Sequence, residues 1–110
     1  MQISTRQMPT ATILDITGNI NLEHSTEVRR AVLLEIRLKR SPKIILNLRE
    51  VNYIDSSGVA SLVEGLKASR DVGSKLVLLA LSPSVYKVLQ LSKLLNFFEI
   101  CESEDKALEG

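Results

Sequence analysis

One segment, residues 43–73, constrains the fold of this chain more than any other part of it. It opens with a mostly apolar run, Ile44 to Leu48, which is typical of a strand covered on both faces. It continues with four apolar residues spaced at i, i+3, i+4 and i+7, namely Val59, Leu62, Val63 and Leu66. This spacing places them on one face of a helix, so the segment predicts a strand followed by an amphipathic helix.

The connection between this strand and this helix is Asp55-Ser56-Ser57-Gly58. The first backbone N–H groups of a helix have no partner within it, and the helix dipole puts about half a positive charge beside them. A hydroxyl there can cap the helix, and a phosphate on it would occupy an anion site. We expect Gly58 to leave this corner uncrowded. Two interpretations stay open: Ser56 or Ser57 is an N-cap and nothing more, or one of them is a modification site.

The rest of the chain alternates between strand and helix patterns. We expect strands over residues 2–8, 11–17, 75–81 and 97–100, with the first two forming a hairpin through Pro9-Thr10. Further helices are expected to begin near residues 25, 83 and 103. The order β-β-α-β-α-β-α-β-α predicts an α/β fold with a mixed, mostly parallel sheet of about five strands and about four helices. A chain of 110 residues is expected to form one domain, residues 1–110.

Local signals predict where the helices begin and end. Asn21 or Ser25 can cap the first long helix, and Gly73 suits the position just after the helix that follows Ser57. Ser82-Pro83 is a typical helix start, with Ser as N-cap and Pro at the first helical position. Of the Phe97-Phe98 pair, we expect one ring to face outward as a contact candidate. The apolar side of the first helix is expected to comprise Val28, Ala31, Val32, Leu34, Ile36 and Leu38.

Composition argues against several classes of protein. The net charge is +1 and aromatic residues make up 4% of the chain, so neither nucleic acid nor an anionic membrane is an expected partner. The longest apolar run, Leu76 to Leu81, is far shorter than the ~20 residues of a membrane-spanning helix. A single cysteine, Cys101, allows no intramolecular disulfide, and no leader pattern is visible. We therefore expect a soluble cytoplasmic protein.

The residues needed for common kinds of catalysis are not found together. A serine hydrolase needs a base beside its nucleophile, and the one histidine, His24, is more simply read as a solvated residue before the first helix. One histidine and one cysteine far apart do not make a zinc site. Neither a P-loop nor a G-x-G-x-x-G motif is present. We therefore expect no catalytic residue, metal or cofactor, and interpret the chain as the substrate of a kinase rather than an enzyme.

These motifs resemble the anti-sigma factor antagonists, the STAS-domain family. An apolar strand, Asp-Ser-Ser-Gly, a helix, a Gly before an apolar strand, and Ser-Pro opening a further helix occur in that order over nearly the whole chain. The resemblance implies a single STAS-like domain. It also implies that Ser57, directly before the Gly, is the phosphorylation site, and that Asp55 is the acidic residue opening the motif. The choice of Ser57 over Ser56 depends on this resemblance.

The resemblance also implies partners. The unphosphorylated form would bind an anti-sigma factor that is often a serine kinase, and phosphorylation would release it; a PP2C-type phosphatase would reverse the modification. The alternative is a STAS switch module acting on a non-sigma target, such as a signalling enzyme, a biofilm regulator, or a scaffold or transporter complex. A monomer or weak dimer is expected. The residues expected to contact the partner are Asn21, His24, Asp55, Ser56, Ser57 and Gly58.

The sequence departs from the family pattern in one place. Family members often carry Gly-Glu-Leu-Asp after the second strand, whereas this chain has Gly18-Asn19-Ile20-Asn21. Two negative charges are therefore missing from a loop that the resemblance places beside the motif. This puts in doubt any partner contact made through an acid there, although Asn21 can still cap a helix.

Overall fold

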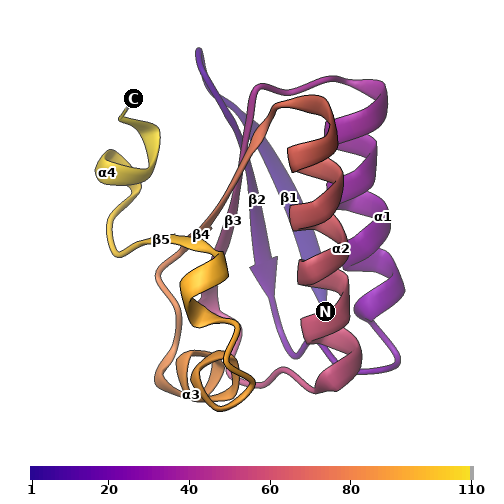
Figure 1. The fold of residues 1–110 in the computed structure, drawn as a ribbon, viewed down its shortest axis with the longest axis vertical. Helices are drawn as coiled ribbons and strands as arrows, with labels where there is room; N and C mark the ends of the chain where they lie inside the picture. The colour runs from indigo at the N-terminus through magenta and orange to yellow at the C-terminus, as the bar shows by residue number, and fades with distance from the viewer. Residues whose placement is uncertain (110) are drawn as a thin grey trace.

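The computed structural model describes residues 1–109, which form a five-stranded sheet in the order β1-β2-β3-β4-β5 (Figure 1). Strand β1 is antiparallel to β2, and every later neighbour is parallel. The hairpin through Pro9-Thr10 and the mixed, mostly parallel sheet are thus confirmed. The strands are β1 (Gln2–Gln7), β2 (Thr12–Thr17), β3 (Lys43–Glu50), β4 (Lys75–Leu79) and β5 (Glu99–Cys101).

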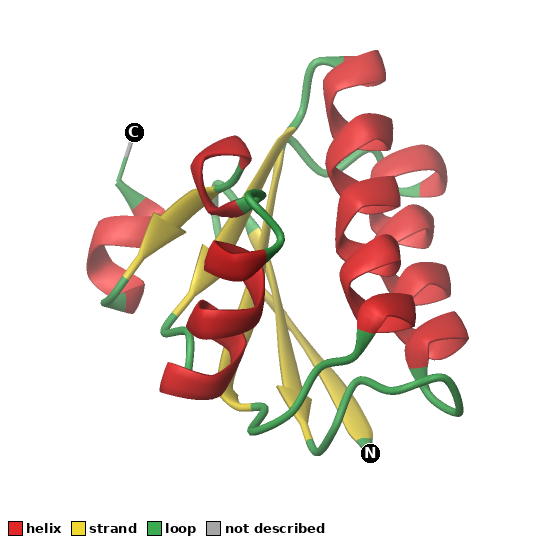
Figure 2. Cartoon of the chain, turned by 60° about the horizontal axis from the view of Figure 1, so that its bottom comes forward, coloured by secondary structure: helices red, strands yellow, loops and turns green. Residues whose placement is uncertain are grey.

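Four α-helices follow the predicted order, and α1 and α2 lie side by side along one face of the sheet (Figures 1 and 2). A π-helical segment, Leu34–Leu38, continues α1, and a 3₁₀ turn, Leu95–Phe97, precedes β5. The connections between the parallel strands carry the helices, as right-handed crossovers require. The helices are α1 (Ser25–Leu33), α2 (Ser56–Val72), α3 (Pro83–Leu91) and α4 (Glu104–Leu108).

Strand β3 lies at the centre of the core. Ile44, Leu46 and Leu48 face the layer of α1, α2 and α3, while Ile45 packs in a second cluster with Ala107 of α4. Successive side chains of a strand point to opposite faces, so both faces of β3 are covered, as its apolar run predicts. A central strand buried in this way holds its carboxyl end, and the start of α2 after it, in a fixed place.

The predicted helix ends are confirmed in α2 and α3. Gly73 follows α2 with φ +74°, a left-handed conformation that glycine adopts without steric cost. The Ser82 hydroxyl accepts a hydrogen bond from the Val85 N–H and so caps α3, with Pro83 at the first helical position. These ends depend on contacts within a few residues, which is why the sequence alone is sufficient to predict them.

The apolar side predicted for the first helix is wrong in part. Leu34 and Leu38 are exposed, whereas Glu35 is buried. The π-helical segment adds an extra residue to the turn and rotates the later residues away from the predicted stripe. The buried Glu35 carboxylate accepts a hydrogen bond from the Ser41 hydroxyl and pairs with Lys39 Nζ at 3.0 Å, so it is satisfied where it lies.

The last predicted strand begins two residues too early. Phe97 belongs to the 3₁₀ turn, and the strand itself is Glu99–Cys101. Phe98 is buried in the main core, whereas the Phe97 ring is 56% exposed. One ring of the pair does face outward, as expected, although the turn rather than strand alternation separates the two.

Arg6 of β1 joins β2 and α4 through two carboxylates. Its guanidinium donates to Asp15 at 2.6 and 2.9 Å and to Glu104 at 2.7 and 3.2 Å. The hydrogen bonds from Arg6 hold the pKa of both carboxyl groups below their usual values. A carboxyl whose pKa is depressed in the folded state contributes stability above its unfolded pKa, and this contribution disappears as the pH falls through the folded pKa.

We therefore expect Arg6→Gln to lower the melting temperature at pH 7 by about 4 °C. This corresponds to a loss of about 1 kcal/mol of stability, since the ion pairs are partly exposed and screened by solvent. The difference from the parent should shrink as the pH falls below about 4, the unfolded carboxyl pKa. Thermal melts at a series of pH values check this prediction. The control is Arg30→Gln, which removes an arginine at an exposed position of α1. An equal difference at every pH would show that the carboxylates are not responsible.

Candidate partner-docking and phosphorylation site

Asp55 caps α2. Its backbone is extended, and its carboxylate oxygen Oδ1 accepts a hydrogen bond from the Gly58 N–H at 3.0 Å. Ser56 and Ser57 are the first two residues of the helix itself. The expectation that one of the two serines is the N-cap is therefore wrong, because the carboxylate one residue earlier already occupies that position.

The two serines differ in their contacts. The Ser57 hydroxyl donates to Asp55 Oδ1 at 2.6 Å and is half-buried. Ser56 is exposed, and its hydroxyl makes no hydrogen bond within residues 1–109. The Ser57 hydroxyl, followed by the Gly58 and Leu22 N–H groups, holds the pKa of Asp55 below its usual value. Asp55 therefore carries its negative charge at neutral and mildly acidic pH, beside a hydroxyl held in one orientation.

Asp55 also ties the motif to the loop between β2 and α1. Its second carboxylate oxygen accepts from the Leu22 N–H at 3.0 Å. The Asp55 N–H in turn donates to the Ile20 carbonyl at 3.2 Å, and the Ile20 N–H donates to the Tyr53 carbonyl at 2.9 Å. The loop that the resemblance places beside the motif does lie there, and the Ser57 hydroxyl and the Leu22 backbone bind opposite oxygens of one carboxylate.

Asn21 shapes the same loop. Its side-chain oxygen accepts from the backbone N–H groups of Glu23 and His24, at 3.1 and 3.2 Å. These bonds hold the turn that leads into α1, while the residue directly before α1 is His24. Asn21 thus caps this turn rather than α1 itself, and Ser25 is the first residue of α1 rather than its cap.

Gly58 is required by close packing rather than by open access. It is buried, and a Cβ atom there would lie 2.5 Å from both the Ile20 carbonyl oxygen and the Ile54 Cγ1 atom. Real Cβ contacts are never this short. The expectation that Gly58 leaves the corner uncrowded is therefore corrected: the corner is crowded underneath, and only glycine lets the loop approach α2 so closely.

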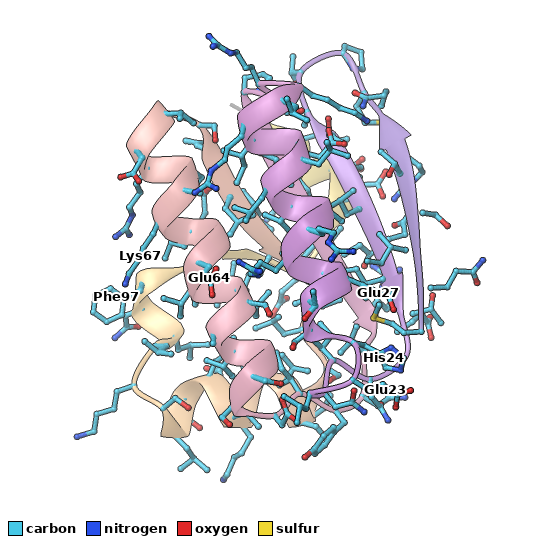
Figure 3. All side chains as sticks on the ribbon, turned by 90° about the vertical axis from the view of Figure 1, so that its right-hand side faces the viewer. Glu23, His24, Glu27, Glu64, Lys67 and Phe97 are labelled. Atoms are coloured by element: carbon cyan, nitrogen blue, oxygen red, sulfur yellow. The ribbon has the colours of Figure 1, made fainter. Side chains whose placement is uncertain are left out.

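His24 is not the solvated residue that the sequence suggests. Its side chain is 25% exposed, its Nδ1 atom is buried, and this atom lies 3.6 Å from a Glu27 carboxylate oxygen. Figure 3 shows His24 between Glu23 and Glu27 at the base of α1. The proton of the Ser57 hydroxyl points to Asp55. No hydrogen bond joins His24 to Ser57 in the described part of the chain, so these two residues do not form a nucleophile and its base.

Two exposed apolar side chains flank the corner and were not anticipated. Leu22 is 78% exposed and Tyr53 is 51% exposed. Both are fixed close to Asp55, Leu22 through its backbone N–H and Tyr53 two residues before it in the chain. Their positions in loops next to the motif are a signal that could have revealed them. Exposed apolar residues of this kind suit a surface that another protein covers.

Residues 1–109 contain neither a cluster of side chains suited to a metal ion nor a helix suited to crossing a membrane. No group of three or more His, Cys, Asp or Glu side chains in this range could hold a metal ion. In the same range, no helix has both the length and the apolar character that crossing a membrane requires.

Comparison with known proteins agrees with this geometry. The STAS domain family matches residues 2–107. The anti-sigma-B factor antagonist of Listeria monocytogenes is 30% identical over 86 residues, which are 77% of this chain and 74% of that protein. The crystal structure of a candidate anti-sigma factor antagonist from Thermotoga maritima is 25% identical, with a TM-score of 0.89 over 96% of this chain and 91% of that one.

A third likeness concerns the fold alone. SpoIIAA, a Bacillus cell fate determinant solved in its phosphorylated form, is 21% identical with a TM-score of 0.75, and the match covers 97% of this chain and 96% of that one. Together with the β-β-α-β-α-β-α-β-α order and the Asp55–Gly58 corner, these matches show that the chain belongs to the STAS domain family. The described relatives that it matches include an anti-sigma F factor antagonist of Paenibacillus polymyxa and the anti-sigma-B factor antagonist of Listeria monocytogenes.

Proposed function

We propose that this protein is an anti-sigma factor antagonist that works as a phosphorylation switch. Its unphosphorylated form binds an anti-sigma factor that is also a serine kinase. Phosphate transfer to Ser57 ends the complex, and a PP2C-type phosphatase restores the binding form. The observation that carries the proposal is the Ser57 hydroxyl, partly accessible at the start of α2 and 2.6 Å from the carboxylate that holds the neighbouring loop.

Charge explains how a single modification could end binding. Phosphorylation adds about −1.5 to −2 charges at neutral pH. Placed beside the Asp55 carboxylate, this charge makes the corner strongly negative and adds bulk where a partner would dock. A negatively charged partner surface is then repelled. An apolar partner surface that fits the free hydroxyl would have to strip water from the charged group, which is also unfavourable. The relatives described as antagonists of anti-sigma factors, and a related fold solved in a phosphorylated form, support this interpretation.

The experiment uses the native cell extract and four immobilised forms: the parent, Ser57→Ala, Ser57→Asp and the control Ser56→Ala. We expect the parent, Ser57→Ala and Ser56→Ala to recover the same ATP-binding protein, and Ser57→Asp to recover much less. The recovered ATP-binding protein, once purified, should transfer phosphate from ATP to the parent chain and to Ser56→Ala but not to Ser57→Ala. Equal recovery by all four forms, or phosphorylation of Ser57→Ala, would contradict the proposal.

Leu22 and Tyr53 are the expected apolar anchors of the docking surface. Because Asn19 and Asn21 stand where family members often carry acids, the partner contact has fewer charges to use here. We expect Leu22→Ser and Tyr53→Ser each to weaken binding of the recovered kinase by about tenfold or more, as truncation of a central apolar contact does.

The melting temperature should hardly change in either variant, since both side chains are largely exposed. Leu38→Ser is the matched control, because Leu38 is equally exposed but lies at the far end of the α1 and π-helical segment. Calorimetric titration of the kinase with each variant gives the affinities. A loss with Leu38→Ser as large as with Leu22→Ser would place the docking surface elsewhere.

A further inference from the structure

We propose that the protein has a second site, at the end of α2 opposite Ser57, which binds a small organic anion: a carboxylate or phosphate attached to a short apolar body. The site lies beyond the last turn of α2, whose 17 residues span roughly 25 Å at 1.5 Å per residue. It shares no residue with the Asp55–Gly58 corner.

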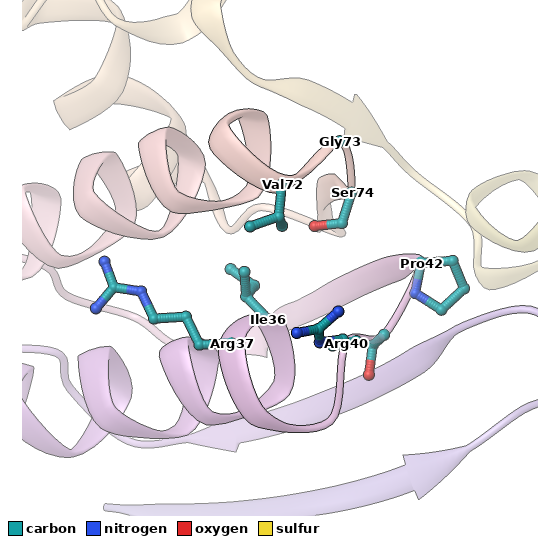
Figure 4. Close-up of a pocket in the computed structure, with 8 residues that line it drawn as sticks. Ile36, Arg37, Arg40, Pro42, Val72, Gly73 and Ser74 are labelled. Carbon is teal, nitrogen blue, oxygen red and sulfur yellow. The ribbon is translucent and has the colours of Figure 1, made fainter.

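The site is a pocket of about 440 Å³ between the end of the π-helical segment and the end of α2. Figure 4 shows Val72 and Ser74 on one side, and Ile36 and Arg40 on the other. Pockets for small ligands usually hold 300–1,000 Å³, so this one suits a compact molecule. Its main lining residues are Ile36, Arg37, Arg40, Pro42, Val72 and Ser74.

The charge of this pocket favours an anion. Neither Arg37 nor Arg40 forms a salt bridge with any carboxylate in residues 1–109. The nearby Glu35 carboxylate is already bonded to Ser41 and Lys39. A guanidinium group binds carboxylate and phosphate oxygens through paired hydrogen bonds, so the Arg40 guanidinium at this pocket suits that class of ligand. The Arg37 side chain extends away from Arg40, on the other side of Ile36, and adds positive charge there (Figure 4).

A buried hydroxyl supports the same assignment. The Ser74 Oγ atom is buried and finds no hydrogen-bond partner within the described residues. Buried polar groups in folded proteins nearly always have a partner, so this hydroxyl gains a hydrogen bond if its side chain turns from its buried position toward the pocket. It would then donate its proton to an oxygen of a bound carboxylate or phosphate.

The backbone at Arg40 adds a further observation. Its φ angle is +53°, a left-handed conformation that residues other than glycine adopt uncommonly. Arg40 follows the C-cap residue of the π-helical segment, where a left-handed residue commonly ends a helix, and the Ser41 N–H closes this end by donating to the Glu35 carbonyl at 2.9 Å. Here it places Arg40 at the mouth of the pocket, where the chain turns toward Pro42.

The dipole of α2 disfavours an anion in this pocket, but its effect is smaller than that of the nearby arginine. The pocket lies at the C-terminal end of α2, which carries about half a negative charge. Two of its last carbonyls, those of Ser69 and Arg70, already accept hydrogen bonds from the Ser74 and Gly73 N–H groups. The full charge of the Arg40 guanidinium outweighs this partial charge. Buried Ile36 and half-exposed Val72 provide an apolar wall for the body of the ligand.

The test uses the chain of residues 1–110 and three probes: hexanoate, hexyl phosphate and inorganic phosphate. Backbone amide shifts of Arg40, Gly73 and Ser74 are followed by NMR during titration. We expect saturable shifts with hexanoate and with hexyl phosphate. Inorganic phosphate should bind about tenfold more weakly or worse than hexyl phosphate, since it lacks the hydrocarbon chain that leaves water on binding. If inorganic phosphate binds as tightly as hexyl phosphate, or no probe gives saturable shifts at these amides, the proposal is wrong.

Variants separate a specific site from general charge attraction. Arg37→Gln with Arg40→Asn removes both charges, and Asn tolerates the left-handed backbone at position 40. We expect this pair to weaken hexyl phosphate binding by about tenfold or more, whereas Arg30→Gln, which removes an exposed charge elsewhere on α1, should not. Val72→Glu, which adds a repelling carboxylate on the exposed rim, should weaken binding in the same way and serves if the double variant fails to fold. Unchanged affinity in the folded variants would overturn the proposal.

Discussion

A phosphate on Ser57 is expected to weaken binding of the partner kinase by about 100-fold or more, which corresponds to about 2.7 kcal/mol of binding free energy. The hydroxyl proton that now binds Asp55 is lost on phosphorylation, and a dianion takes its place beside the Asp55 carboxylate. A partner that covers this corner must remove water from the dianion beside the Asp55 carboxylate, and removing water from an unpaired ion costs several kcal/mol, so this loss is within the range expected. Protein carrying phosphoserine at position 57, titrated against the kinase by calorimetry, gives the affinity.

The same modification should leave the fold intact. A negative charge at a helix N-terminus is favourable by about 1 kcal/mol or less, which offsets the lost hydrogen bond to Asp55. We expect the melting temperature to change by less than about 4 °C in either direction. Phosphoserine at position 56 is the matched control, since that side chain is exposed and does not contact Asp55. A loss of many degrees with phosphoserine 57 would mean that the modification unfolds the domain rather than blocking a surface.

Gly58→Ala is expected to damage both stability and binding. The added methyl group would meet the Ile20 carbonyl oxygen and Ile54 at 2.5 Å, so the loop or the helix must move. Overpacking of this kind costs about 1–3 kcal/mol, which is roughly 10 °C in melting temperature for a domain of this size. Because the movement separates Leu22 from Asp55, binding of the kinase should also fall by about tenfold or more, even well below the melting temperature.

Gly65→Ala is the matched control for this prediction. Its added methyl group meets the Val32 side chain at 2.9 Å, on the contact between α1 and α2, and a side chain can shift where a backbone carbonyl cannot. We expect a smaller loss of stability and no change in affinity. Melting curves and calorimetric titrations of both variants decide the matter. If Gly58→Ala matched the parent in both measurements, the close approach of the loop would have no role.

Much of this fold could be predicted from the sequence because its signals are local. The buried run Ile44 to Leu48 and the Ser82-Pro83 helix start each depend on neighbours in the chain, and both are confirmed. The π-helical segment that turns Leu34 outward could not be predicted, because no local pattern marks it. It is accompanied by a buried link between Glu35 and Ser41, six residues apart, that helical periodicity does not reveal.

The candidate site was predictable in position but not in detail. The Asp55–Gly58 motif marks the start of α2, where the two serines do lie. The Asp55 cap is a local contact with Gly58, three residues on, and Asp is a favoured N-cap, so this detail could have been predicted from the sequence. That the Asp55 carboxylate also binds Leu22 depends on a loop 33 residues earlier in the chain. The same long-range contact explains Gly58, whose close neighbour is Ile20. Spacing along the chain gives no information about such contacts.

The decisive measurement is a map, by mass spectrometry, of phosphate on the chain isolated from its native cells. We expect phosphate on Ser57 and not on Ser56, and the kinase recovered only with the unphosphorylated fraction. Phosphate on Ser56 alone, or a kinase bound equally to both fractions, would contradict it.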